Sequence, residues 1–226
     1  MPAPPDARRW TRLFVRRTER LRTTWTLRIT IVVVAAAGLW LSQGWWSVAM
    51  ARSLVCDRDA APSDAILIEN FDPDYRLFER AATLRRTGLA RRVLVPVAAD
   101  AFGANRVARA IAETMADISR IGPVEIVPIR EIEPISFNAG LDVRNFAVRE
   151  GIHSVIVVSP LFRSRRSVLV YNATLGRSGI SVRCDPGQED RAVTSWLETS
   201  HGIQNVAEQW LKLRYYQLYV LPFRSR

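Results

Sequence analysis

Residues 64–97 read DAILIENFDPDYRLFERAATLRRTGLARRVLVPV, and this stretch decides the fold. Two short runs rich in β-branched residues, at 65–69 and 92–97, predict strands, and the segment between them has the period of an amphipathic helix. Asp72-Pro73 is a good helix opening, with aspartate as N-cap and proline at the first helical position, and Gly88 is a good helix end. The order strand, helix, strand is typical of a parallel sheet covered by helices.

The same alternation continues along the chain and predicts the class of the fold. Further strands are predicted over 124–129, 154–159 and 180–184. Helices are predicted over 74–87, 105–120, 138–150, 163–175 and 203–219, with Gly151 and Gly176 as further helix ends. We therefore expect an α/β domain, a Rossmann-like three-layer sandwich with a mostly parallel sheet of about five strands, preceded by one N-terminal transmembrane helix.

The transmembrane helix is predicted from the apolar segment that precedes this domain. Residues 29–51 contain no charged side chain, and as one helix they would span roughly 35 Å. Trp40, Trp45 and Trp46 lie towards the end of the segment, where aromatic rings favour the water interface. The resulting organisation is a cytoplasmic basic tail over 1–26, a transmembrane helix over 27–47, a linker over 48–62 and the α/β domain over 63–226.

Most of the positive charge of the chain lies before the apolar segment. The 226 residues carry a net charge of +10, and between Met1 and Arg28 eight arginines face only Asp6 and Glu19. By the positive-inside rule this tail stays in the cytoplasm and the domain is exported. The domain itself is only mildly basic, so no nucleic-acid partner is expected. One alternative stays open, a signal peptide removed after Ala51.

The chain has two cysteines, Cys56 and Cys184. In an oxidising exported compartment they could form a disulfide that ties the linker to the end of the fifth strand. The sequence leaves open whether they are bonded.

Candidate ligand-binding residues follow the predicted strands, because ligands of parallel sheets bind outside the carboxyl ends of the strands. Ser159 precedes a helix start that carries several arginines, and this combination suits a phosphate group. The alternative is an ordinary helix cap followed by a solvated arginine face. The candidates are Glu69 and Asn70 after the first strand, Glu133, Ser136 and Asn138 after the third, and Ser159, Arg163, Arg165 and Arg166 after the fourth.

Two further interpretations of these residues remain open. Glu69, Glu133, Ser136 and Asn138 could converge as acid, base or sugar-binding groups, or they could be helix caps and surface residues. The chain has only two histidines, and it lacks a phosphate-binding glycine loop, a Cys-x-x-Cys motif and a paired-histidine helix motif. We therefore expect neither a metal site nor a cofactor, and whether the chain is an enzyme stays undecided.

A series of short motifs occurs in order along residues 63–216. They are Asp64-Ala65 at the start of the first strand, Arg80, Leu84 and Gly88 at the end of a helix, Glu133, Ser136 and Asn138 in a loop, Val157-Val158-Ser159 followed by Arg165, and Glu208, Lys212, Tyr215 and Tyr216 near the end. This ordered set resembles the YdcF, SanA and ElyC group of bacterial envelope proteins, which share a domain of unknown function. The chain departs from that group where it has Glu69-Asn70-Phe71 and Pro96-Val97-Ala98 in place of glycine-containing turns, Ala139 after Asn138, and Phe162 at the position of a histidine.

The resemblance implies a protein of the bacterial inner membrane whose periplasmic or otherwise extracytoplasmic domain serves peptidoglycan, lipid-carrier or surface-polysaccharide metabolism. Combined with the arginines after Ser159, it predicts binding of a phosphorylated glycan or lipid-linked precursor, with Arg165 as the best single candidate. The alternative is a non-catalytic interaction module or scaffold that binds proteins of an envelope or polysaccharide-export assembly. Fold analogy alone adds a nucleotide-like small ligand.

Overall fold

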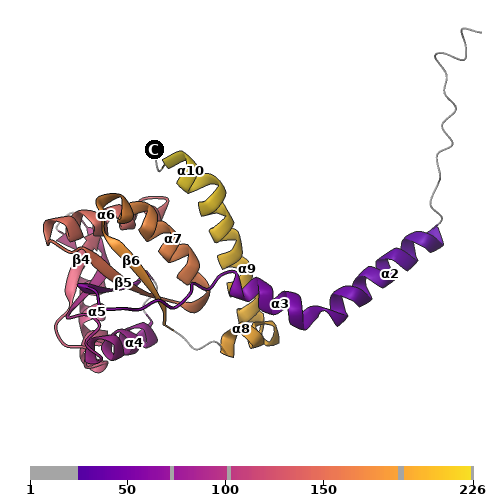
Figure 1. The fold of residues 1–226 in the computed structure, drawn as a ribbon, viewed down its shortest axis with the longest axis horizontal. Helices are drawn as coiled ribbons and strands as arrows, with labels where there is room; N and C mark the ends of the chain where they lie inside the picture. Colours follow the sequence, from indigo (N-terminus) through magenta and orange to yellow (C-terminus); the bar gives the residue numbers. More distant parts are fainter. Residues whose placement is uncertain (1–24, 72–73, 101–102, 188–190, 225–226) are drawn as a thin grey trace, which may run out of the picture. The chain divides into compact units, whose positions relative to one another are not determined.

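The computed structural model describes residues 25–71, 74–100, 103–187 and 191–224 (Figure 1). The predicted Asp72-Pro73 helix opening therefore lies outside the described residues, and so does the basic tail over 1–26 except for its last two residues. The chain divides into two units, 1–43 and 44–226, and each is described by itself.

The first unit contains the helix α2 (Trp25–Leu41), none of whose residues is buried. The sequence predicts one continuous helix over 27–47, but the structure has a break at Ser42, after which α3 (Gln43–Arg52) begins. Gly38, Ser42 and Gly44 explain the break, because glycine is a poor helix former and the Ser42 hydroxyl donates to the Gly38 carbonyl at 2.7 Å. Among the described residues no single helix is long and apolar enough to cross a membrane, whereas α2 and α3 together meet that test by length and composition.

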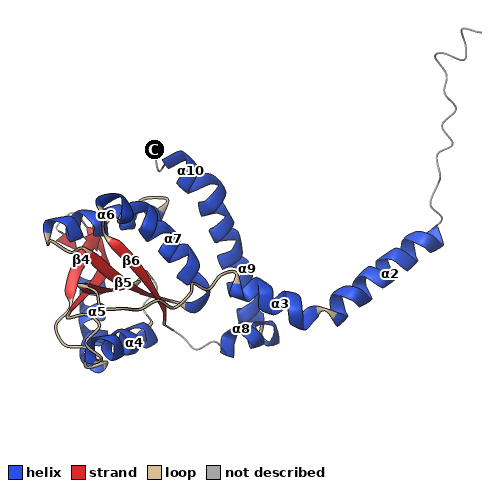
Figure 2. Cartoon of the chain, viewed as in Figure 1, coloured by secondary structure: helices blue, strands red, loops and turns tan. Residues whose placement is uncertain are grey.

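The second unit is an α/β domain built on a mostly parallel sheet (Figure 2). Five parallel strands lie in the order β4-β2-β1-β5-β6, and β3 pairs antiparallel with the end of β2. The sheet thus has six strands instead of about five, because the second strand runs on to Asp100 and the chain turns back as β3. The strands are β1 (Ala65–Ile68), β2 (Arg92–Asp100), β3 (Gly103–Ala104), β4 (Glu125–Ile129), β5 (Ser154–Ser159) and β6 (Ser181–Pro186).

Helices cover both faces of the sheet, so the domain has three layers. Alternating strand residues supply the two cores: Ile66 and Ile68 of β1 pack with α4 and α5, whereas Ala65 and Leu67 pack with α6 and α7. The four helices are α4 (Tyr75–Arg86), α5 (Arg106–Ile118), α6 (Ile135–Arg149) and α7 (Ser164–Thr174).

Local chemistry sets the helix ends, with some differences from the expected ones. The N-cap of α4 is Asp74, whose carboxylate accepts from the Arg76 N–H at 3.0 Å, and not Asp72. Helix α6 begins at Ile135, earlier than expected. Gly176 does not end α7 in a left-handed conformation; a 3₁₀ turn, Gly176–Ser178, follows, and Gly179 has the positive φ of 76°.

The carboxyl-terminal part adds a further set of helical turns beside the sheet (Figure 1). The sequence predicts only one helix here, over 203–219. The structure has α8 (Arg191–Ser195), the 3₁₀ turn η3 (Trp196–Glu198), α9 (Ser200–Tyr215), a π-helical turn η4 (Tyr216–Val220) and α10 (Leu221–Arg224).

Residues that the sequence assigns to the end of the membrane segment and to the linker pack into the folded unit. Ala51 and Leu54 are buried with Trp196 and Val206. The Trp196 indole N–H donates to the Ser47 carbonyl at 3.1 Å, and its ring meets the ring of Trp46 edge-on. Residues 44–62 are therefore held by tertiary contacts that a reading of hydropathy alone does not reveal.

Candidate functional site

The strand order places a candidate site at the carboxyl ends of β1 and β5. Strand β1 lies between β2 and β5, and the connections that leave it and return to β5 run over opposite faces of the sheet. Open α/β sheets bind ligands at such a switch point. Glu69 and Asn70 follow β1 there, and Ser159 ends β5, as the sequence analysis expects.

Glu69 is bound within the protein and does not face solvent. Its side chain is 1% exposed, and one carboxylate oxygen accepts from the Ser167 hydroxyl of α7 at 2.5 Å. Its backbone N–H donates to the Val158 carbonyl. Glu69 therefore contributes negative charge to the neighbourhood without presenting a free acid or base.

Several buried polar atoms beside Glu69 have no hydrogen-bond partner among the residues that the structure describes. They are the Ser159 hydroxyl, the Tyr171 hydroxyl and the Asn70 side-chain oxygen. Burial is the main cause that raises the pKa of Tyr171 well above its ordinary value, and the negative charge of Glu69 adds to it. Tyr171 consequently stays protonated at neutral pH and keeps an unused hydrogen-bond donor.

Arg166 is a buried arginine held by neutral groups. It is 6% exposed, donates to the Ser136 hydroxyl at 3.0 Å and to the Gln209 side-chain oxygen at 3.2 Å, and lies over the Tyr216 ring. It forms no ion pair with a carboxylate of the described residues. Burial lowers its pKa, while the nearby charge of Glu69 opposes the shift.

Arg166 lines a hollow of about 310 Å³ together with other polar and aromatic side chains. Arg163 and Lys212 also border a neighbouring hollow of about 540 Å³, so the two hollows share two cations. Together they have the size of a small-ligand site. The smaller hollow is lined by Phe71, Glu131, Glu133, Ile135, Ser136, Arg163, Arg166, Lys212, Tyr215 and Tyr216.

The structure brings some of the residues predicted from sequence to this place and takes others elsewhere. Glu133, Ser136, Arg163 and Arg166 line the smaller hollow. Arg165 does not: it is exposed and lines a separate hollow with Cys56 and Asp59. Consecutive residues of a helix point about 100° apart, and here Arg166 turns towards the smaller hollow while Arg165 turns away from it.

The expected anion site at the beginning of α7 is already occupied by the chain. Ser159 is fully buried, and its carbonyl accepts from the Gly187 N–H. The Arg165 N–H donates to the Leu54 carbonyl, and the Ser164 hydroxyl accepts from the Cys56 N–H. Asn138 likewise holds its own loop, because its side-chain amide donates to the Ile132 carbonyl at 2.9 Å.

Some residues of the hollow have only a weak sequence signal or none. Lys212, Tyr215 and Tyr216 belong to the closing motif of the family resemblance but stand far from the strand ends in the sequence. Gln209, which lines the larger neighbouring hollow, and Tyr171, which lies near Glu69, are buried on helices and cannot be told from ordinary core positions in the sequence. The docking of α9 against α7 brings Gln209 to Arg166.

Cys56 and Cys184 are joined in a disulfide. The disulfide ties the segment after α3 to β6. A hydrogen bond joins the same two segments, because the Cys184 N–H donates to the Asp59 carboxylate. The disulfide lies beside the hollow that contains Arg165.

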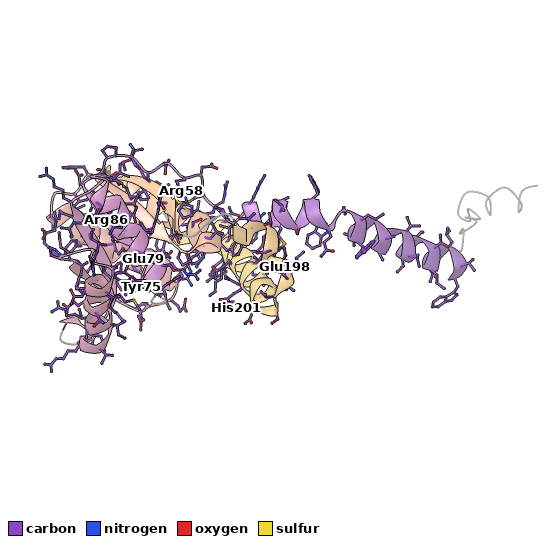
Figure 3. The ribbon with its side chains drawn as sticks, turned by 90° about the horizontal axis from the view of Figure 1, so that it is seen from below. Arg58, Tyr75, Glu79, Arg86, Glu198 and His201 are labelled. Carbon is purple, nitrogen blue, oxygen red and sulfur yellow. A yellow bond between two sulfur atoms is a disulfide. The ribbon has the colours of Figure 1, made fainter. Side chains whose placement is uncertain are left out.

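A larger hollow, of about 600 Å³, lies along α4 and is also rich in arginine. Figure 3 labels Arg58, Tyr75, Glu79 and Arg86 from its lining. Its innermost arginine, Arg80, donates two hydrogen bonds of 2.8 Å to the fully buried Asp185. Because that charge is matched inside the protein, we regard the smaller hollow at Arg166 as the better candidate despite its size.

No group of acidic, histidine or cysteine side chains suited to hold a metal ion occurs in the described part of the chain. Comparison of the chain with models of known families, with curated proteins and with solved structures finds no match. The resemblance to the YdcF, SanA and ElyC group stays a prediction from the motifs. The chemistry of the site is therefore argued from the geometry of its own residues.

Proposed function

We propose that this chain is a single-pass, membrane-anchored protein of the bacterial cell envelope that binds a phosphorylated glycan or lipid-carrier intermediate. The proposed site is the hollow lined by Arg163, Arg166 and Lys212. The proposed activity is binding.

The observation that carries the proposal is the environment of Arg166. A buried guanidinium is costly unless an anion compensates it, and here its direct partners are neutral groups. An arginine fork matches the oxygen geometry of a phosphate group, and Arg163 and Lys212, the latter paired with Glu208, border the same space. A bound phosphate would give Arg166 the direct ionic partner that Glu69, which acts on it without an ion pair, does not provide.

The rest of the lining suits the remainder of such a ligand. The half-exposed Tyr215 offers an aromatic surface for a sugar ring, and Glu131 and Glu133 offer acceptors for hydroxyl groups. The exposed, apolar α2 supports the proposed membrane anchor. An anchored domain would meet lipid-linked precursors at the membrane surface.

The test is a binding screen on the full chain in detergent or lipid, with inorganic phosphate, undecaprenyl phosphate, sugar nucleotides and peptidoglycan fragments as probes. A ligand that binds only the folded chain raises the melting temperature by an amount that grows with the logarithm of its excess over Kd. Arg166→Gln should weaken binding of the best probe about tenfold or more, since a hydrogen bond from a charged group contributes about 1.5–3 kcal/mol.

Arg165→Gln is the matched control. It removes the same charge from the neighbouring residue of the helix, whose side chain faces a different hollow. It should leave the affinity within about twofold of the unchanged chain, in line with a screened, exposed charge. If no probe changes the melting temperature, or if the two substitutions weaken binding equally, the proposed site is wrong. Such a result would favour the alternative of an interaction module or scaffold.

A further inference from the structure

The C-terminal helical segment has two apolar faces, of which the domain covers only one. Elements α9, η4 and α10 follow one another without a break from Ser200 to Arg224. Val206, Leu213, Tyr216 and Val220 are buried against the domain. A second set of large apolar side chains faces solvent and forms what we call the C-terminal stripe: Leu211, Tyr215, Leu218, Tyr219 and Phe223.

The C-terminal stripe is both exposed and ordered. Leu218 is 73% exposed and Phe223 is 71% exposed. The Tyr215 and Tyr219 rings stack with centroids 5.5 Å apart, and the Phe223 ring follows at 5.7 Å from Tyr219. Soluble surfaces seldom expose so many large apolar side chains in one row unless something covers them.

The charges around the stripe indicate what covers it. From Leu211 to the end, the sequence contains Lys212, Arg214, Arg224 and Arg226 and no acidic residue. Glu208, one turn before the stripe, is paired with Lys212. A helix with leucine and aromatic side chains on one face and mainly cations beside them is typical of a segment that lies in the surface of an anionic bilayer. Tyrosine favours that depth, because its ring is apolar and its hydroxyl reaches water.

We propose that the C-terminal stripe binds the surface of an anionic lipid bilayer and gives the domain a second membrane contact besides the apolar N-terminal segment. A contact between two copies of the chain would bring the cations of one stripe, such as Arg214, near those of the other, and the nearest acidic group, Glu208, is already paired with Lys212. Lipid phosphate groups compensate such cations directly. Tyr215 belongs to the stripe and also lines the proposed site, so the two features share this side chain.

A lipid-quenching experiment tests this contact. The full chain is reconstituted in vesicles of phosphatidylcholine, with or without phosphatidylglycerol, after Leu218→Cys is labelled with an environment-sensitive fluorophore under non-reducing conditions. Val107→Cys is the matched control, since Val107 is also an exposed apolar position of a helix, 68% exposed on α5. Both variants keep the same anchor, so a difference between them belongs to the stripe.

The probe at 218 should shift its emission to the blue and lose intensity to nitroxide lipids that carry the quencher near the headgroup, more strongly with phosphatidylglycerol and less in high salt. The probe at 107 should behave as in water. The inference fails if the probe at 218 stays water-like in anionic vesicles, or if its blue shift occurs without lipid quenching, which would indicate a second copy or a protein partner. Phosphate-probe affinity measured on the same samples reports separately on the proposed function.

Discussion

The two ends of the parallel sheet are built from similar polar residues but use them differently. At the amino ends the Asp64 carboxylate accepts from the His153 N–H at 2.8 Å and from the Ser154 N–H at 2.9 Å. Arg92 pairs there with Glu125 and Glu150, which raises the pKa of Arg92. At the carboxyl ends of β1 and β5, some buried polar atoms lack partners among the described residues, and the hydrogen-bond partners of Arg166 in this part of the chain are neutral.

Under the proposed function, the difference separates groups that stabilise the fold from groups at the proposed ligand site. Buried polar groups of folded proteins are nearly always satisfied, so a cluster of exceptions calls for an explanation. The carboxyl ends are not uniform, however, because Asp185 at the end of β6 is fully paired by Arg80. Stability measurements can test this division residue by residue.

The largest effect is expected at the paired charge of the carboxyl end. Arg80→Ala should lower the free energy of unfolding by about 3 kcal/mol, because it leaves the buried Asp185 carboxylate without its main partner. Arg58, at 3.8 Å, compensates only part of the loss. Urea unfolding measures the effect, with Arg86→Ala as the control on an exposed turn of the same helix. Equal losses in the two variants would show that Asp185 does not depend on Arg80.

The two fully buried serines of the carboxyl end give a matched pair. Ser167→Ala should cost about 2 kcal/mol of unfolding free energy, because it removes a hydrogen bond to the buried Glu69 carboxylate. Ser159→Ala should be neutral or slightly stabilising, because its hydroxyl has no partner among the described residues. Chemical denaturation of both variants without ligand makes the comparison. If Ser159→Ala lowers the free energy of unfolding as much as Ser167→Ala does, the Ser159 hydroxyl has a hydrogen-bond partner after all.

The smallest effect is expected at Asp64 of the amino end, and it depends on pH. The His153 backbone N–H is the largest cause that lowers the pKa of Asp64 below its ordinary value of 3.8. Burial, the next largest cause, opposes this shift, and the hydrogen bonds from Ser154 add to the lowering. The stabilisation is therefore complete above the ordinary value and is lost as the pH falls through the lowered pKa. Asp64→Asn should cost about 1 kcal/mol at pH 7, reduced by solvent exposure, and progressively less in acid.

Unfolding of the Asp64→Asn variant is compared with Asp57→Asn, an exposed aspartate for which the structure shows no hydrogen bond of the side chain among the described residues. The control reports how the loss of an aspartate charge outside this hydrogen-bond network affects stability over the same pH range. A pH-independent cost at Asp64 would mean that the carboxylate acts there through packing instead of charge.

The layered α/β fold could be predicted from the sequence because its signals are local. The predicted bounds of β5 agree with the observed ones, and those of β1, β2 and β4 agree in their start or to within a few residues. β-branched runs between segments with a helical period can be recognised without tertiary information. For the site, the sequence predicts only the edge of the sheet at which it lies, and not which side chains face it. The carboxyl-end rule selected Glu69, Ser136 and Arg166, but it also selected Arg165, which faces another hollow.

The sequence by itself thus determined the order of strands and helices, the apolar character of the N-terminal segment and the edge at which polar groups collect. Tertiary structure alone decided the rotation of α7 that turns Arg166 inward and Arg165 outward. It also decided the packing of residues 44–62 against Trp196 and the position of α9 that brings Gln209, Lys212 and Tyr216 to the hollow. Periodicity reports which face of a helix is apolar, but contacts between distant segments decide which polar residue at the border of that face becomes buried.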